Sequence, residues 1–155
     1  HAHLPYVRSS QPGSLEEDWF FQALLESYLP LLELLEAAAE DPAQAPRLTL
    51  GLSPTLLSLL SAPDLQARFP AWLDQRLALL PLALPPHLEA AEALEAQLTH
   101  TRQQWQACGG DLLARFQRLW QLGVVDLLTC AATHGYLPLL ARSAAGGLRS
   151  ALRGA

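Results

Sequence analysis

Prolines are the feature of this sequence that most limits its fold, because they divide the leucine-rich stretches into short segments. The chain has 155 residues, of which 50% are apolar and 12 are proline. Pro30 and the later group of Pro81, Pro85 and Pro86 interrupt the leucine-rich runs before they reach the roughly 20 apolar residues of a membrane span. No basic start precedes an apolar run, so a secretory signal is not indicated. We therefore expect a globular, cytoplasmic protein with no membrane segment.

The net charge limits the expected partners, and the cysteine content indicates the redox compartment. The formal net charge is -5, and the 10 basic residues are scattered, so no basic stripe is available to follow a phosphate backbone. Nucleic acid is therefore not an expected partner. The two cysteines, Cys108 and Cys130, are too few for a disulfide framework and lack metal-ligand spacing, which is typical of ordinary thiols in a reducing compartment.

A helix is predicted to begin near Leu15, where Glu16, Glu17 and Asp18 supply the negative charge that a helix amino terminus favours. Pro30 should kink or interrupt this helix. Apolar residues then recur close to the 3.6-residue helical period and predict one apolar face, packed on a sheet. The residues of this face are Trp19, Leu24, Tyr28, Leu32 and Leu35.

Helical pattern dominates residues 54–122. Asp111 is a suitable cap for the last helix of this stretch, and Gly123 a suitable end. The predicted breaks lie near Pro63, at 81–86 and at Gly109–Gly110.

Two short segments have the pattern of buried strands. Residues 47–53 follow a proline, alternate in part and end at Pro54, while residues 124–130 are rich in valine and leucine and follow a helix. A strand after a helix is typical of α/β repeat units, in which the strands are parallel. The fold class predicted is therefore a helix-rich α/β fold with parallel strands near 47–53 and 124–130.

Three histidines are candidates for ligand binding because of their expected places after strands. Parallel α/β barrels bind ligands at the carboxyl ends of their strands. His1 and His3 would lie there if an upstream strand leads into them, and His134 follows the second predicted strand, beside Gly135. From the residues alone, isolated histidines are more often structural or surface groups, so both interpretations stay open.

Several motifs, in order, resemble those of glycoside hydrolase family 57. They are HAHLPYVR at 1–8, LEEDW at 15–19, ESYLPLL at 26–32, LSPTL at 52–56 and TCAATHGYLPLL at 129–140. The last resembles the second signature block of the α-1,4-glucan branching enzymes in that family. Ordered motifs over roughly residues 1–140 are far more specific than one short pattern.

The resemblance implies a fold and a division of the chain. The family fold is an incomplete barrel of seven parallel strands with surrounding helices, so residues 1–140 would form the amino-terminal part of a (β/α)7 catalytic barrel. Residues 141–155 depart from the family pattern and consist of small residues and arginine. We expect this tail to be a poor helix or disordered, and the chain to be a piece of a longer protein.

The resemblance also implies roles for individual residues. His1 and His3 match the first signature block, Trp19 matches an aromatic residue of the sugar cleft, and His134 matches a histidine at the subsite of the scissile glucose. Trp19 could equally be a core anchor of its helix, because tryptophan packs readily. The family uses a retaining mechanism with two carboxylates. The matching nucleophile Glu and acid/base Asp belong to later signature blocks, beyond Ala155, so we expect an α-1,4-glucan partner, no catalytic residue and no cofactor.

Two alternatives remain open at this point. His1, His3 and His134 could hold a zinc ion with one open position, as in a metal-dependent hydrolase of a related barrel. Alternatively, the chain could be a remnant that binds glucan without catalysis or is inert. If the chain is part of a barrel, its two or three parallel strands leave open edges, so we expect the isolated chain to self-associate or to be loosely packed and dye-binding.

Overall fold

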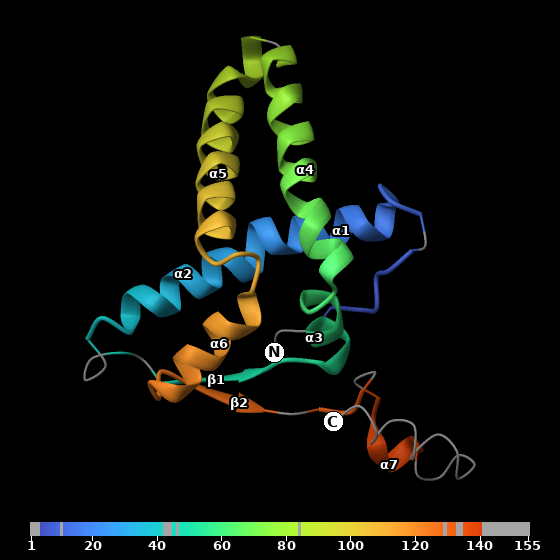
Figure 1. Ribbon diagram of the computed structural model, residues 1–155, viewed down its shortest axis with the longest axis vertical. Coiled ribbons are helices and arrows are strands. Elements are labelled where there is room, and N and C mark those ends of the chain that lie inside the picture. Colours follow the sequence, from blue (N-terminus) through green and yellow to red (C-terminus); the bar gives the residue numbers. More distant parts are fainter. Residues whose placement is uncertain are drawn as a thin grey trace.

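The computed structural model describes residues 4–9, 11–41, 45, 47–83, 85–128, 130–132 and 135–140. A helical layer lies above a pair of strands, and one helical hairpin projects from that layer (Figure 1). The elements are α1 (Leu15–Ala23), α2 (Leu29–Ala38), β1 (Leu48–Gly51), α3 (Pro54–Leu60), α4 (Pro63–Leu79), α5 (Leu88–Ala107), α6 (Leu112–Gln121), β2 (Val125–Leu128) and α7 (Leu137–Leu140).

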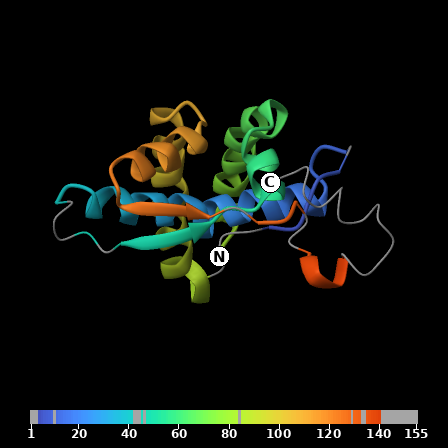
Figure 2. The same ribbon diagram turned by 90° about the horizontal axis from the view of Figure 1, so that it is seen from below.

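The two strands confirm the predicted fold class, a helix-rich α/β arrangement with parallel strands. β1 and β2 pair in parallel, with Leu48 opposite Val125 and Gly51 opposite Leu128. Both lie within the predicted ranges, 47–53 and 124–130. Seen from below, they run side by side and point in the same direction (Figure 2). Their carboxyl ends therefore meet at one edge of the sheet.

The two faces of this sheet have different environments. Alternation along the strands places Leu48, Leu50, Val125 and Leu127 on one face. Leu50 and Val125 are buried there, and β2 contacts α6. On the other face Thr49 and Asp126 are exposed, and 56% of Leu128 is accessible to solvent. We call this second side, formed by Thr49, Gly51, Asp126 and Leu128, the open face of the sheet.

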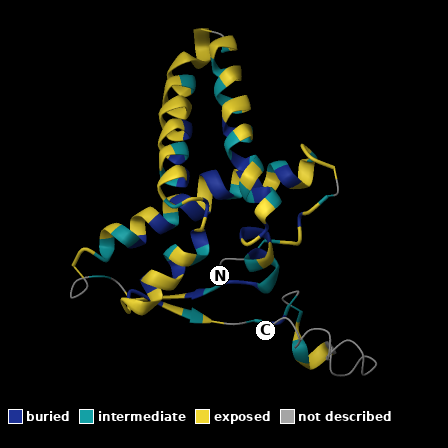
Figure 3. Cartoon of the chain, in the orientation of Figure 1, coloured by how far each residue is buried: buried dark blue, intermediate teal, exposed yellow. Residues whose placement is uncertain are grey.

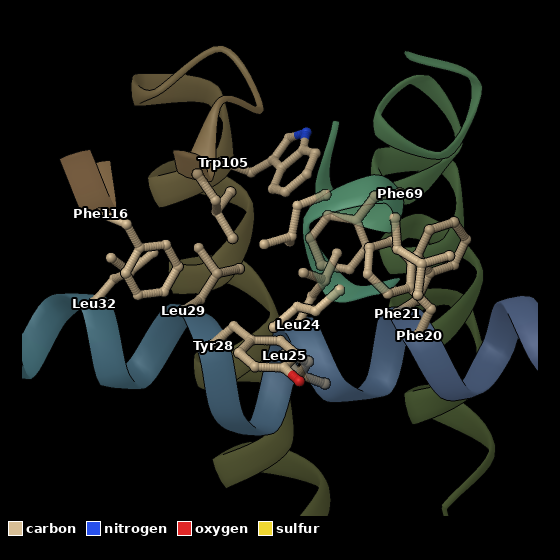
Figure 4. Close-up of a cluster of buried hydrophobic side chains, with 14 of the residues drawn as sticks. Phe20, Phe21, Leu24, Leu25, Tyr28, Leu29, Leu32, Phe69, Trp105 and Phe116 are labelled. Carbon is tan, nitrogen blue, oxygen red and sulfur yellow. The ribbon is translucent and has the colours of Figure 1, made fainter. Parts of the chain in front are cut away.

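The core lies between the helices, and its centre is aromatic (Figure 4). Phe21 from α1 meets Phe69 from α4 with ring centroids 5.4 Å apart, and Phe69 meets Trp105 from α5 edge-on at 4.6 Å. Phe116 from α6 is also buried. Offset and edge-on ring geometries of this kind add to the stabilisation that comes from burial alone.

The predicted apolar face of the first helix is partly confirmed and partly wrong. Leu24, Tyr28, Leu32 and Leu35 are buried as expected, but 54% of Trp19 is exposed, and Phe20 and Phe21 begin the buried face instead. This face packs on α4 and α6 and not mainly on the sheet. Phe20 and Phe21 precede Leu24 by four and three residues, which matches the helical period, whereas Trp19 precedes it by five and so lies off the buried face.

Pro30 interrupts the regular helix without ending the helical path. A π-helical turn at Leu24–Tyr28 separates α1 from α2, and the Leu29 N–H donates to the Leu24 carbonyl across it. Proline lacks an N–H, and its ring clashes with the carbonyl four residues earlier, so a wider turn before it relieves the clash. The result is one long helical rod across the molecule (Figure 1).

The other predicted helix boundaries are confirmed. α3 ends before Pro63, and α5 ends just before Gly109 and Gly110, both of which have positive φ. The Asp111 side chain accepts from the Ala114 N–H and caps α6, and Gly123, with φ of 73°, follows its end. The far half of the α4–α5 hairpin is largely exposed (Figure 3).

Three further expectations concern membrane segments, the cysteines and the tail. None of the described helices is long and apolar enough to cross a membrane. Cys108 and Cys130, both in the described part, are free thiols. The tail at 141–155 lies outside the described residues.

Candidate functional site

Of the four predicted site residues, Trp19 is described, whereas His1, His3 and His134 lie outside the described residues. Trp19 is on the exposed side of α1, so its alternative role as a core anchor is wrong. The convergence of His3 and His134 stays a prediction. The structure does place the segments that flank these histidines.

The segment directly after His3 is held at the carboxyl end of β1. The Thr55 hydroxyl, at the start of α3, donates to the Leu4 carbonyl oxygen at 2.9 Å. Ser53, which follows β1 and is only 1% exposed, lies 2.9 Å from the same Thr55 hydroxyl. Val7 is buried. The described chain therefore begins, at Leu4, beside the carboxyl end of β1, which is the edge where ligands bind in parallel α/β folds.

The segment that leads to His134 departs from the same edge. Gly51 of β1 is the register partner of Leu128, the last residue of β2, so the two strands end together. Ala131, which follows, is buried. In both views, the start of α1 lies toward this end of the strands (Figures 1 and 2). Of the described chain, the segment after β2, the segment that starts at Leu4 and the start of α1 thus lie toward the same side of the molecule.

An ion-pair network fixes the amino-terminal segment to α1 and α4. Arg8 bonds Asp64 at 3.0 Å, Asp64 bonds Arg68 at 3.1 Å, and Arg68 bonds Glu17 at 2.9 Å. Glu17 is buried and also accepts from the Gly13 N–H at 3.1 Å. Glu17 therefore holds the turn before α1 by accepting from Gly13, and its carboxylate also pairs with the charge of Arg68.

The pKa values of Asp64 and Arg68 shift in the directions that favour their charged forms. Desolvation acts to raise the pKa of Asp64, but the Arg68 hydrogen bond and the charges of Arg8 and Arg68 lower it below its ordinary value of 3.8. The hydrogen bond to Glu17 is the main cause that raises the pKa of Arg68. Both groups stay ionised under ordinary conditions.

We predict that Arg68→Met lowers the free energy of unfolding by about 2 to 3 kcal/mol, because it leaves the buried Glu17 carboxylate unpaired. Arg102→Met is the matched control, since Arg102 pairs with Asp74 on the surface and both side chains are more than 40% exposed. Such exposed pairs contribute about 1 kcal/mol or less. Urea unfolding followed by circular dichroism, at one chain concentration, measures both. Equal losses would contradict the role given to Glu17.

Trp72 lies close to this region but is committed to packing. Its indole N–H donates to Asp18 at 2.7 Å, Phe69 stacks on its ring, and the Arg76 guanidinium lies 4.9 Å from the ring centroid. Arg76 also pairs with Asp18. Phe69 and Arg76 thus lie against the Trp72 ring, whereas 54% of Trp19 is exposed.

A groove of about 760 Å³ lies elsewhere. It runs between α2, α5 and α6 and includes Glu36, Cys108, Arg115 and Leu122. Leu122 precedes β2, so this groove is toward the end where the strand begins. Ligands of parallel α/β folds bind at the opposite end, so we do not assign the glucan site to this groove.

A metal site is not found among the residues that the structure describes, where no three histidine, cysteine or acidic side chains gather. The proposed zinc ligands His1, His3 and His134 lie outside those residues. The metal-dependent alternative therefore stays untested.

Two parallel strands below a helical layer define the chain as a helix-rich α/β protein. The family model of glycosyl hydrolase family 57 matches residues 1–148. This match covers nearly the whole chain. The chain belongs to glycosyl hydrolase family 57.

Relatives of known sequence and structure support this assignment. A 1,4-alpha-glucan branching enzyme of Thermococcus kodakarensis is 30% identical over 148 residues, which are 94% of this chain and 22% of that enzyme. A GH57-type branching enzyme from Pyrococcus horikoshii superposes with a TM-score of 0.80 at 31% identity, covering 91% of this chain and 27% of that one. The α-amylase AmyC from Thermotoga maritima superposes with a TM-score of 0.78 at 25% identity, covering 99% and 31%. The chain thus spans about a fifth to a third of these proteins.

Proposed function

We propose that these residues form the amino-terminal part of a 1,4-alpha-glucan branching enzyme and carry one side of its glucan-binding cleft. In this proposal, the open face of the β1–β2 sheet belongs to an incomplete seven-stranded barrel. Residues His1, His3, Trp19 and His134 bind sugar. The observation that carries the proposal is the anchoring of Leu4, the neighbour of His3, to Thr55 at the carboxyl end of β1.

The chemistry of the four side chains suits a glucan. Imidazole nitrogens can donate to and accept from sugar hydroxyls, and an exposed indole face can stack on the apolar side of a pyranose. Trp19 is 54% exposed, so its side chain is accessible for such stacking. We propose that the glucan site lies at the carboxyl ends of β1 and β2, beside the loops that follow them. This is the edge where parallel α/β folds bind their ligands.

We further propose that the chain carries neither catalytic carboxylate. The acidic side chains nearest the site have structural partners: Glu17 pairs with Arg68, Asp18 with Arg76, and Asp64 with Arg8. A retaining glycosidase needs one carboxylate free to attack and another free to deliver a proton. A carboxylate paired with an arginine is poorly suited to either task.

Hydrolysis of α-1,4-glucans is the second candidate function. The likeness to the Thermotoga maritima α-amylase favours it, because this chain is covered over 99% of its length in that comparison. Branching is preferred because the 30% and 31% identities are with branching enzymes, against 25% for the amylase. Both candidates use the same substrate class and the same proposed binding edge.

Two matched tryptophan variants test the binding site. Trp19 and Trp120 are 54% and 53% exposed, but Trp120 lies on α6, which ends just before β2 begins. We expect Trp19→Ala to weaken the binding of maltoheptaose by roughly tenfold, equivalent to about 1.4 kcal/mol, because a stacking platform is lost. Trp120→Ala should leave affinity unchanged. Isothermal titration calorimetry measures both, and the reverse order would contradict the proposed location.

A further inference from the structure

Two side-chain hydroxyl groups, those of Ser53 and Thr55, connect the end of β1 to the amino-terminal segment. Ser53 Oγ accepts from the Leu56 N–H at 3.3 Å and lies 2.9 Å from Thr55 Oγ1, which in turn lies 2.9 Å from the Leu4 carbonyl oxygen. A carbonyl oxygen can only accept, so Thr55 must give it its single hydroxyl proton. Ser53 must then donate to Thr55. The donor and acceptor of both hydrogen bonds are thereby fixed: Ser53 donates to Thr55, and Thr55 donates to the Leu4 carbonyl oxygen.

This arrangement pins the backbone next to His3. Leu4 is followed by Pro5, which has no N–H and a restricted φ, and the Pro5 carbonyl accepts from the Val7 N–H. Val7 is buried. The segment is thus held at Leu4 by the Thr55 hydroxyl and at Val7 by packing. Consecutive Cα atoms are about 3.8 Å apart, so a movement of Leu4 is transmitted directly to His3.

We infer that Thr55 is a positioning residue of the glucan site: its hydroxyl holds the Leu4 carbonyl, and through it the segment that carries His1 and His3. This inference rests on the proposed function, because it assigns Thr55 to that same site. Thr55 does not contact sugar in this scheme. It acts by restricting the backbone that presents the histidines. Less conformational entropy is therefore lost when the glucan binds.

Three variants of the full chain separate the hydroxyl from side-chain shape. Thr55→Val keeps the shape and removes the hydroxyl, and Thr55→Ser keeps the hydroxyl. Thr49→Val makes the same chemical change at an exposed strand position. Two measurements are made on each: amide hydrogen exchange of residues 4–9, with α3 as the internal reference, and maltoheptaose affinity.

We expect Thr55→Val to speed exchange in residues 4–9 by about tenfold or more, with α3 still protected, and to weaken maltoheptaose binding by about five- to tenfold. Thr55→Ser should restore both values, and Thr49→Val should change neither. Unchanged exchange in Thr55→Val would overturn the inference, as would faster exchange with unchanged affinity. If the unmodified chain does not bind maltoheptaose, the proposed function fails, while the exchange of residues 4–9 still decides whether Thr55 holds them.

Discussion

Incubated with amylose, the purified chain is expected to form no α-1,6 linkage and no new reducing end above the uncatalysed background. The retaining route needs a nucleophilic carboxylate and an acid/base carboxylate about 5 to 5.5 Å apart, on either side of the scissile bond. In the proposal neither is present, and the acidic residues near the binding edge are paired with arginine. Binding and orientation without these groups leave the covalent step closed.

Chromatography of debranched products detects α-1,6 linkages, and a reducing-end assay detects hydrolysis. Asp18→Asn and Glu17→Gln are informative controls, because both residues lie at the start of α1 near the proposed site. Measurable activity that either substitution abolishes would place a catalytic carboxylate within the chain. That result would contradict the proposed division between binding residues here and catalytic residues elsewhere.

Self-association of the isolated chain is the second large effect that we expect. In the described part the sheet has only two strands, so each has one edge without a strand partner. The open face adds Leu128, which is 56% exposed beside Asp126 and Thr49. Unpaired strand edges and exposed apolar groups favour pairing with another chain. The helical core is well buried, so association through the open face is expected in preference to general unfolding.

Two leucine variants locate the surface that associates. Leu128→Glu should shift the chain toward monomer, whereas Leu82→Glu should not, although Leu82 is 73% exposed between α4 and α5. Light scattering and sedimentation at several chain concentrations measure the change, and binding of a hydrophobic dye should fall with it. A strictly monomeric chain with a sharp two-state melt would mean that these residues close their own core and that the barrel proposal is wrong.

Local sequence signals predicted most of the element boundaries. Pro63, the glycines at 109–110 and Gly123 mark helix ends because their backbone limits are local properties of the residue. Both strands were predictable because short β-branched and leucine-rich runs lie between turn residues. The parallel-strand pattern indicated the binding edge and the three histidines, and the family motifs added Trp19 and the sugar-binding roles.

Long-range contacts were not predictable in the same way. The helical period separates Phe20 and Phe21 from Trp19, but it does not indicate that Phe21 packs against Phe69 and Trp72 of α4. The Thr55 to Leu4 and Arg68 to Glu17 contacts each join residues 51 positions apart. No local pattern marks such pairs, since they arise only when the elements have packed.

The most direct test of the glucan site uses the chain's five histidines as reporters. His100 pairs with Glu33 on the surface of α5, and His87 lies just before α5 begins, so both serve as internal controls. Imidazole resonances, assigned from single His→Gln variants, are followed by NMR while maltoheptaose is added. The proposal predicts that His3 and His134 shift together along one binding curve while His87 and His100 stay in place. Shifts confined to His87 or His100, or none at His3 and His134 when binding is detected by calorimetry, would contradict it.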